Sequence, residues 1–214
     1  MILHSLHLLI ADDHPLFRLG LKDYLLRCPG VVEVDEAASG NELLQKIDGR
    51  AYDCIILEIA LPGANGLAFI GQVIKRSPRA RLIIYSMYPE DQFGSRALRA
   101  GAACYLTKDS DPELLKEAVL KVSRGERYIV PSLAQKLGEE ALSGRKGLPH
   151  ELLSDREFQV LTMIAAGKTV SGIASELKIS VKTVSTHRSH ILEKMNLRNN
   201  AELIRYALEH GLVL

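Results

Sequence analysis

Short apolar runs alternate with amphipathic segments through the first 125 residues of the chain. Because these runs are nearly continuous and rich in β-branched residues, they are typical of strands in a parallel sheet that is covered on both faces. Helical spacing between the runs predicts five successive strand–helix units, which form a three-layer sandwich with right-handed crossovers. The predicted strands are Leu6 to Ala11, Val31 to Val34, Cys54 to Leu57, Leu82 to Tyr85 and Ala103 to Leu106.

Each segment between the strands carries apolar residues at the spacing of one helix face. In the first of these helices, we expect the face that packs on the sheet to consist of Leu16, Leu19, Tyr24 and Leu25.

The pattern changes after residue 125 and divides the chain into three parts. Residues 1–125 form the predicted α/β domain, and residues 126–149 are predicted to be a linker with one helix over residues 131–142. Glycine and basic residues make Ser143 to Pro149 typical of a flexible connection. Residues 150–214 have helical spacing throughout and predict a separate all-α domain of four helices.

Complementary polar residues end four of the five predicted strands. Because the carboxyl ends of parallel strands meet at one edge of a sheet, these side chains should converge. Three clustered carboxylates repel one another unless a hard cation lies between them, so the pattern predicts a Mg²⁺ site. A nearby lysine can neutralise a carboxylate or a phosphoryl oxygen. Ordinary solvated strand ends are the alternative. The residues are Asp12 and Asp13, Glu58, Ser86, and Thr107 with Lys108.

The C-terminal third has the caps and spacing of a helix-turn-helix. Ser154 and Glu157 have the spacing of a capping box at the start of one helix, which Gly167 ends. Ser171 is expected to cap a second, short helix, and a tight turn follows it. The third helix, Val181 to Met195, is the predicted recognition helix.

This predicted recognition helix has one apolar stripe and one polar stripe. The polar stripe, at positions i, i+3, i+4 and i+7, consists of Lys182, Ser185, Thr186 and Ser189. The whole chain is nearly neutral, with 27 basic and 26 acidic residues, but five basic residues and one acidic residue lie between Lys178 and Arg198. This local excess can neutralise several phosphates of a duplex. A plain four-helix domain with a solvated face is the alternative that spacing alone leaves open.

Composition narrows the class of protein further. The chain has 47% apolar residues and no run that approaches the length of a membrane span. Its N-terminus, MILHSLHLLIADD, lacks a basic region before the apolar stretch, so we expect a strand and not a signal peptide. Three scattered cysteines without metal-ligand spacing predict buried thiols in a cytoplasmic protein without partners in a membrane.

Residues 5–125 resemble the receiver domain of bacterial two-component systems. The resemblance lies in the segments IADDHP, LEIALPGANG, YSM and YLTKD. It implies a flavodoxin-like fold with a five-stranded parallel sheet in the order 2-1-3-4-5. It also implies a Mg²⁺ site of Asp12, Asp13, the acceptor side chain and the carbonyl of Ala60, and a switch formed by Ser86, Tyr105 and Lys108.

The phospho-accepting aspartate of such receivers is replaced by Glu58. The extra methylene moves the carboxylate outward by about 1.5 Å, and positioned phosphoryl transfer is sensitive to displacements of this size. The same carboxylate lies nearer to the place of phosphoryl oxygens and can draw Ser86 and Lys108 partway to their active positions. Its single charge makes the mimicry partial. We therefore expect a phosphorylation-independent or partly switched-on receiver, with ordinary phosphorylation as the alternative.

Residues 150–212 closely resemble the LuxR-type DNA-binding domain, through LSDREFQVL, IASELKIS, VKTVSTHRSHILEKMNLRNNAELI and YALEHG. Together with the receiver, this is the arrangement of NarL/FixJ-type response regulators. The resemblance implies double-stranded DNA, RNA polymerase and a sensor histidine kinase as partners, and a homodimer paired through a last helix over Ala201 to His210. It implies base-facing Ser185, Thr186 and Ser189, and backbone contacts from Lys182, Thr183, Arg188 and Lys194.

The base-facing set contains no lysine or arginine, which disfavours bidentate contacts to guanine. It favours backbone contacts, bridging water and thymine methyl groups instead. Asn200 also stands where an arginine is frequent in the resembled family.

The main prediction is a DNA-binding transcription regulator that is not an enzyme. A protein-binding adaptor with a pseudo-receiver and weak DNA binding is the alternative. A phosphatase with Asp12 or Asp13 as nucleophile is a third hypothesis, but no general acid or cap domain accompanies these residues.

Overall fold

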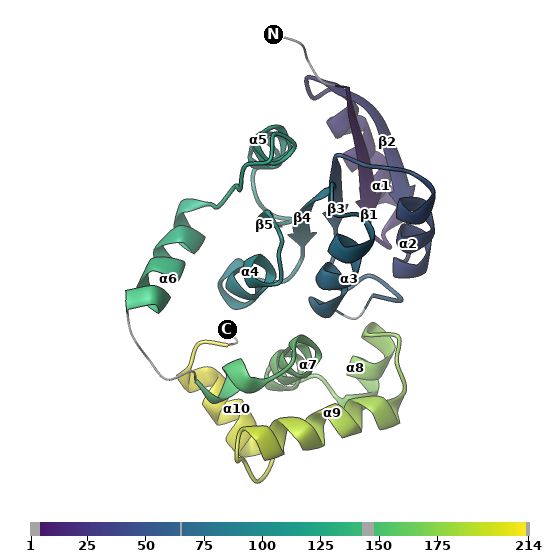
Figure 1. The fold of residues 1–214 in the computed structure, drawn as a ribbon. Coiled ribbons are helices and arrows are strands. Elements are labelled where there is room, and N and C mark those ends of the chain that lie inside the picture. The colour runs from purple at the N-terminus through teal and green to yellow at the C-terminus, as the bar shows by residue number, and fades with distance from the viewer. Residues whose placement is uncertain (1–4, 65, 143–147, 213–214) are drawn as a thin grey trace. The chain divides into compact units, whose positions relative to one another are not determined.

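The chain forms two compact units, residues 1–139 and 140–214 (Figure 1). The computed structural model describes residues 5–64, 66–142 and 148–212.

A five-stranded parallel sheet forms the centre of the first unit, in the predicted order β2-β1-β3-β4-β5. The predicted bounds of β1 and β3 are confirmed to the residue, whereas β2 continues three residues beyond its predicted end. Side chains of β1, β3 and β4 are nearly all buried, as expected for strands covered on both faces. The strands are β1 Leu6–Ala11, β2 Val31–Ala37, β3 Cys54–Leu57, β4 Arg81–Ser86 and β5 Cys104–Thr107.

Helices cover both faces of this sheet (Figure 1). The strand order reverses direction at β1, so right-handed crossovers place α1 on one face and α2, α3 and α4 on the other. The Tyr24 hydroxyl of α1 donates to the Pro112 carbonyl of α5 at 2.8 Å, which puts α5 on the face of α1. The helices are α1 Pro15–Leu26, α2 Gly40–Gly49, α3 Ala68–Arg76, α4 Glu90–Arg99 and α5 Pro112–Val122.

The predicted inner face of α1 is partly wrong. Leu21 and Leu25 are buried, but Leu16 is 85% exposed and Leu19 is 62% exposed. This helix carries leucines on more than one side, so helical spacing alone allowed two choices of buried face.

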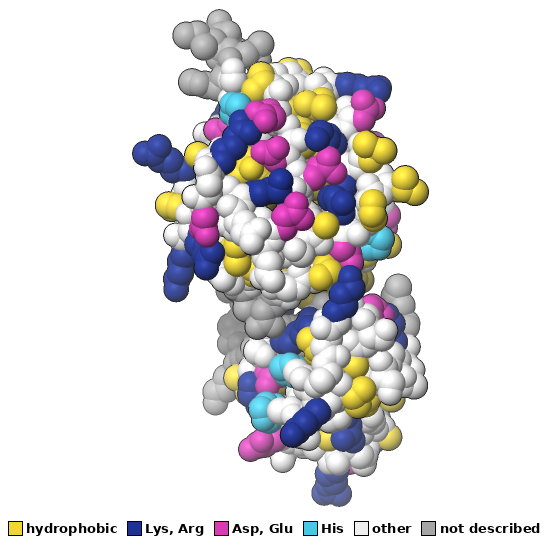
Figure 2. Space-filling view, turned by 90° about the vertical axis from the view of Figure 1, so that its right-hand side faces the viewer, with side chains coloured by type: hydrophobic (Ala, Val, Ile, Leu, Met, Phe, Trp, Pro, Cys, Tyr) yellow, Lys and Arg dark blue, Asp and Glu magenta, His cyan; other side chains and the backbone are white. Residues whose placement is uncertain are grey.

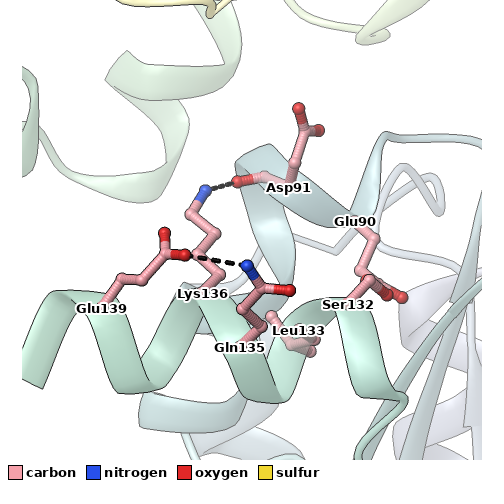
Figure 3. A pocket seen from close by; sticks show the side chains of 7 residues that line it. All are labelled: Glu90, Asp91, Ser132, Leu133, Gln135, Lys136 and Glu139. Atoms are coloured by element: carbon pink, nitrogen blue, oxygen red, sulfur yellow. Dashed lines mark hydrogen bonds between the residues drawn. The ribbon is translucent and has the colours of Figure 1, made fainter.

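Helix α6, Pro131–Leu142, is present over the predicted residues, and its first part belongs to the first unit. Leu133 is 1% exposed and packs against α4 at Gly94, which has no side chain to block it. The Ser132 hydroxyl donates to Glu90 at 2.7 Å, and the Lys136 ammonium donates to the Asp91 carbonyl (Figure 3).

The first unit therefore extends to Glu139 rather than ending at residue 125. The predicted linker of residues 126–149 is shorter than expected, because residues 126–139 pack with the sheet and its helices. Residues 143–147 of that linker lie outside the described residues.

The second unit is helical within its described residues, as predicted. Ser154 and Glu157 form the predicted capping box at the start of α7. The cap of α8 is Thr169 and not Ser171, because the Thr169 hydroxyl accepts from the Gly172 N–H at 3.1 Å. The elements are η1 Pro149–Leu152, α7 Asp155–Ala165, α8 Val170–Glu176, α9 Val181–Lys194 and α10 Asn200–Glu209.

Two expectations from composition concern buried thiols and membrane spans. Cys28, Cys54 and Cys104 are buried free thiols, and burial raises the pKa of each above its usual value. Among the described residues, every helix is too short or too polar to traverse a bilayer.

Candidate functional site

The carboxyl ends of the strands bring four predicted residues into one pocket of the first unit. Asp12 follows β1, Glu58 follows β3, Ser86 ends β4 and Lys108 follows β5. The Lys108 ammonium lies 3.0 Å from a Glu58 oxygen and also pairs with Asp12. The side chains of Asp12 and Glu58 are each 3% exposed and that of Lys108 is 5% exposed, so this charge cluster is shielded from water.

Four groups of the protein contact the Glu58 carboxylate. Its Oε1 accepts from the Ser86 hydroxyl at 2.5 Å and from the Ala60 N–H at 3.0 Å. Its Oε2 accepts from the Met87 N–H at 3.2 Å and pairs with Lys108. A carboxylate offers about four lone-pair sites, so the protein itself satisfies the hydrogen-bonding capacity of Glu58.

Lys108 is the positive charge between two buried carboxylates. Burial lowers the pKa of this lysine, but Glu58 and Asp12 raise it by more, so its pKa lies above the usual value. Its ammonium also lies 4.4 Å from the ring centre of Phe17, a cation–π distance. Lys108 therefore stays charged and holds the ends of β1 and β3 together.

The two predicted switch side chains, Ser86 and Tyr105, are fully buried beside this pocket. The Tyr105 hydroxyl donates to the Tyr88 carbonyl at 2.9 Å, and the Tyr88 N–H donates to the Ser86 hydroxyl oxygen at 3.3 Å. Burial and the Glu58 charge raise the pKa of Tyr105 well above its usual value. A continuous set of hydrogen bonds thus joins Glu58, Ser86, Tyr88 and Tyr105.

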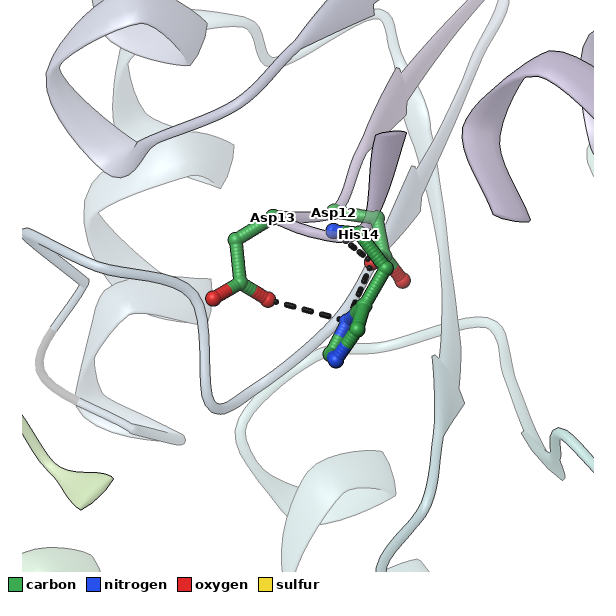
Figure 4. A group of neighbouring side chains, drawn as sticks. All are labelled: Asp12, Asp13 and His14. Atoms are coloured by element: carbon green, nitrogen blue, oxygen red, sulfur yellow. Dashed lines mark hydrogen bonds and ion pairs between the residues drawn. The ribbon is translucent and has the colours of Figure 1, made fainter. Parts of the chain in front are cut away.

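Asp12 and Asp13 lie beside His14, which the sequence analysis did not single out (Figure 4). His14 Nδ1 is 3.1 Å from an oxygen of each aspartate, and one ligand atom from each of the three residues falls within 4.8 Å of the others. Two carboxylates are suitable donors for a hard cation such as Mg²⁺.

The other two predicted metal ligands are Glu58 and the carbonyl of Ala60. The Glu58 oxygens are directed to Ser86, Lys108 and backbone N–H groups, so the third carboxylate of the expected site is already satisfied. Ala60 contributes its N–H to Glu58, and the role of its carbonyl stays a prediction.

In the second unit, α9 has the predicted division into two faces. Val184 and Ile191 are buried, whereas Ser185, Thr186 and Ser189 are exposed. On the face of this unit that Figure 2 shows, lysine, arginine and histidine side chains are scattered among side chains of other kinds. The shape and polarity of α9 suit entry into a major groove.

Two of the predicted DNA contacts have partners inside the domain. The Lys194 ammonium lies 2.7 Å from Glu157, and the Arg188 Nε donates to Asn200 at 2.6 Å. Burial raises the pKa of Glu157, but Lys194 and Ser154 lower it by more, so the carboxylate is ionised. These pairs fix α9 against α7 and α10. Residue types alone do not reveal them, because each pair joins two different helices.

Two histidines on α9 were also missed by the sequence analysis. His187 and His190 line a shallow hollow at the start of α9, together with Lys182, Thr183 and Thr186. Burial and the nearby Arg156 lower the pKa of His187, so its ring is neutral at pH 7. Lys182, a member of the polar stripe, contributes a positive charge to this hollow.

A receiver-type sheet with an acidic pocket, followed by a helix-turn-helix unit, defines a response-regulator architecture. Comparison with known families supports this class. Residues 8–120 match the response regulator receiver domain, and residues 151–207 match the bacterial regulatory proteins of the luxR family. The chain belongs to the LuxR-type DNA-binding response regulators of two-component systems, as the resemblance implied.

Relatives that match nearly the whole chain agree with this membership, and a solved structure shares the fold. The chain is 34% identical to the response regulator GacA of Pseudomonas viridiflava, over 97% of this chain and 98% of GacA. It is 35% identical to the oxygen regulatory protein NreC of Staphylococcus carnosus, over 96% and 98% of the two chains. RcsB of Salmonella enterica serovar Typhimurium, bound to promoter rprA, shares the fold with a TM-score of 0.65 at 24% identity, over 95% and 98% of the chains.

Proposed function

We propose that this protein is a transcription regulator whose receiver is held in a partly switched-on arrangement by Glu58, without phosphorylation. The observation that carries the proposal is the set of contacts around the Glu58 carboxylate. A hydroxyl, an ammonium and two backbone N–H groups are the kinds of donor that stabilise a phosphoryl group, and here all of them contact Glu58.

The mimicry is incomplete because of charge. Glu58 supplies one negative charge, whereas a phosphoryl group supplies about 1.5 to 2. The inward positions of Ser86 and Tyr105 support the proposal, since the hydroxyl of Ser86 is bonded to Glu58 and that of Tyr105 to the Tyr88 carbonyl. The inward arrangement of Ser86 and Tyr105 therefore does not need a phosphoryl group, although Glu58 stabilises it less strongly than a phosphoryl group does.

A Mg²⁺ ion fits the carboxylates of Asp12 and Asp13, with His14 beside them. Such an ion would neutralise negative charge at the edge of the pocket. Lys108 already pairs with Asp12, so part of this neutralisation is supplied by the protein. We propose that the pocket keeps its arrangement without the ion.

On the DNA side, we propose that α9 enters the major groove. Ser185, Thr186 and Ser189 face base edges, and Lys182 and Thr183 face the phosphates, because all five are exposed on α9. Arg188 and Lys194 hold the helix in place through their partners in the domain.

We further propose that two copies pair on DNA through α10, where Leu208 is 57% exposed. A single small module buries limited surface on DNA, so pairing raises the affinity. A sensor histidine kinase, RNA polymerase and a cytoplasmic location belong to the same proposal.

The proposal is tested by two measurements on the full-length protein. The protein is incubated with a small-molecule phosphodonor and Mg²⁺, beside the Glu58→Asp variant, and labelling is measured by intact mass. We expect labelling of the variant and little labelling of the protein itself, together with salt-dependent duplex binding in the absence of phosphodonor. Full Mg²⁺-dependent labelling at Glu58 would falsify phosphorylation independence.

An adaptor that binds protein partners and only weakly binds DNA is the second candidate. Its support is that Arg188 and Lys194 are engaged with Asn200 and Glu157. Duplex affinity that does not fall as the salt concentration rises favours the adaptor, because phosphate contacts release counterions.

A further inference from the structure

Three exposed hydroxyls of α9, those of Ser185, Thr186 and Ser189, have a common hydrogen-bonding arrangement. Each donates its proton to the backbone carbonyl four residues earlier on the same helix. Ser185 donates to Val181 at 3.0 Å, Thr186 donates to Lys182 at 3.0 Å, and Ser189 donates to Ser185 at 3.1 Å.

This arrangement determines what the hydroxyls can offer to DNA. A hydroxyl has one proton and two lone pairs, so once the proton is bonded to the helix the group presents only acceptors. In the major groove, adenine N6 and cytosine N4 are donors, whereas guanine presents the acceptors N7 and O6. The three hydroxyls are therefore matched to amino groups and unmatched to guanine.

The Thr186 side chain adds an apolar contact. With its hydroxyl directed to the helix backbone, its methyl group remains available on the exposed face. Among the bases, thymine carries a methyl group on its major-groove edge, and threonine methyl groups pack against it. Adenine N6 and the thymine methyl belong to the same A·T pair, whereas cytosine N4 supplies an amino group without a methyl group beside it, so the two features together select A·T.

We propose that the face formed by Ser185, Thr186 and Ser189 reads A·T base pairs, with the Thr186 methyl group on a thymine methyl group and the serine hydroxyls accepting from adenine N6. This inference rests on the proposed function, since it presupposes that α9 enters the major groove.

The charges around the face agree with this assignment. Guanine is most often read by arginine or lysine, and Lys194 and Arg188 have partners on other helices. Lys182 lies on the same stripe as the hydroxyls, one turn nearer the start of α9, where a phosphate contact is within reach.

The test begins with selection of duplexes from a random pool by the full-length protein. We expect consecutive A·T pairs in the part of each half-site that faces these three residues. Each thymine of the selected duplex is then replaced in turn by deoxyuridine, which removes only the methyl group. At one position we expect affinity to fall roughly fourfold, the factor for one methyl group withdrawn from water.

Two conservative variants assign that position. Thr186→Ser keeps the hydroxyl and removes the methyl group, so it should bind thymine and uracil duplexes equally. Thr183→Ser removes a methyl group at the side of the face and should keep the fourfold difference. Adenines of the selected duplex are also replaced by purine, which lacks the N6 amino group. At the adenine that Ser189 contacts, this replacement should weaken binding of the protein but should not weaken binding of the Ser189→Ala variant.

The outcomes separate this inference from the function on which it rests. Tight binding to half-sites with guanine at these positions, or a uracil effect that is unchanged in Thr186→Ser, overturns A·T readout and leaves DNA binding intact. Failure of the selection to enrich any duplex overturns the proposed function itself.

Discussion

The Glu58→Ala substitution tests how far the acceptor position sets the state of the receiver. It removes the acceptor for the Ser86 hydroxyl and for two backbone N–H groups, while Lys108 keeps its pair with Asp12. The substitution thus withdraws the group that draws Ser86 inward and leaves the rest of the pocket in place.

The magnitude follows from the strength of that one hydrogen bond. The bond from the Ser86 hydroxyl to Glu58 is 2.5 Å long and buried, and hydrogen bonds to charged groups are worth about 1.5 to 3 kcal/mol. Its loss lowers the ratio of inward to outward Ser86 by about 10- to 150-fold. The loss of DNA affinity cannot exceed this factor if the receiver acts through this equilibrium alone.

Sedimentation and fluorescence anisotropy with a duplex measure dimerisation and affinity for the protein and for Glu58→Ala. We expect Glu58→Ala to dimerise less and to bind the duplex more weakly, by at most about 10- to 150-fold. Asp48→Ala is the matched control, since it removes an exposed carboxylate of the same unit that pairs only with Arg76 in the contacts described. If Glu58→Ala dimerises and binds DNA as the protein itself does, the reasoning about mimicry is refuted.

Three further substitutions test other contacts. Gly94→Ala places a Cβ 2.9 Å from a Leu133 methyl group, so we expect faster amide exchange in α6 and a loss of about 1 to 3 kcal/mol of stability. Glu58→Asp should make Mg²⁺ raise the melting temperature more than it does for the protein, because a shorter carboxylate gives up part of its four bonds and regains oxygen sites for a cation. The folded-state pKa of Glu157 lies below its ordinary value of 4.5, so its pair with Lys194 stabilises the second unit above pH 4.5, and this stabilisation is lost as the pH falls through the folded-state pKa. Glu157→Gln should therefore lower the free energy of unfolding by about 1.5 to 3 kcal/mol at pH 7. It should also make the stability of the second unit less dependent on pH in the acid range.

The same chain supplies controls for these measurements. Gly138→Ala lies on α6 with no atom within 4 Å of the added Cβ, so it should raise helix stability by about 1 kcal/mol where Gly94→Ala lowers it. If Mg²⁺ raises the melting temperature of Glu58→Asp and of the protein equally, the contacts of the Glu58 carboxylate do not keep its oxygens from a cation. A Glu157→Gln curve parallel to that of the protein below pH 4.5 would remove Glu157 from the acid transition.

The architecture was predictable because burial imposes local patterns. The runs of β1 and β3 are continuous where both faces of the sheet are covered, and their bounds were predicted to the residue. Edge strand β2 has a solvent-facing side, so Asp35 and Glu36 interrupt its apolar run and its last three residues, Asp35 to Ala37, were missed. The cap of α7 was predictable for a similar reason, since a cap bonds within its own turn.

Contacts between distant elements could not be derived from spacing. The strand-end rule placed Glu58, Ser86 and Lys108 in one pocket, because the carboxyl ends of parallel strands are brought together by the fold itself. The pairing of Lys194 with Glu157 depends on how α9 crosses α7, and local periodicity carries no information on that crossing. The same limitation explains why α6 was taken for part of a linker, although Leu133 packs on α4.

Side-chain contacts connect the pocket around Glu58 to α6, at the end of the first unit. Tyr88 accepts from Tyr105 and lies with its ring centre 4.9 Å from that of Phe93 on α4. Gly94, the next residue, is where Leu133 of α6 packs. If Tyr105 moves outward, the Tyr88 carbonyl loses its hydrogen bond and the start of α4 is expected to loosen. This part of α4 contains Gly94, the residue on which α6 packs. Changes at Glu58 and at Gly94 therefore act on one packed set of side chains, and their effects on DNA affinity should be less than additive when combined.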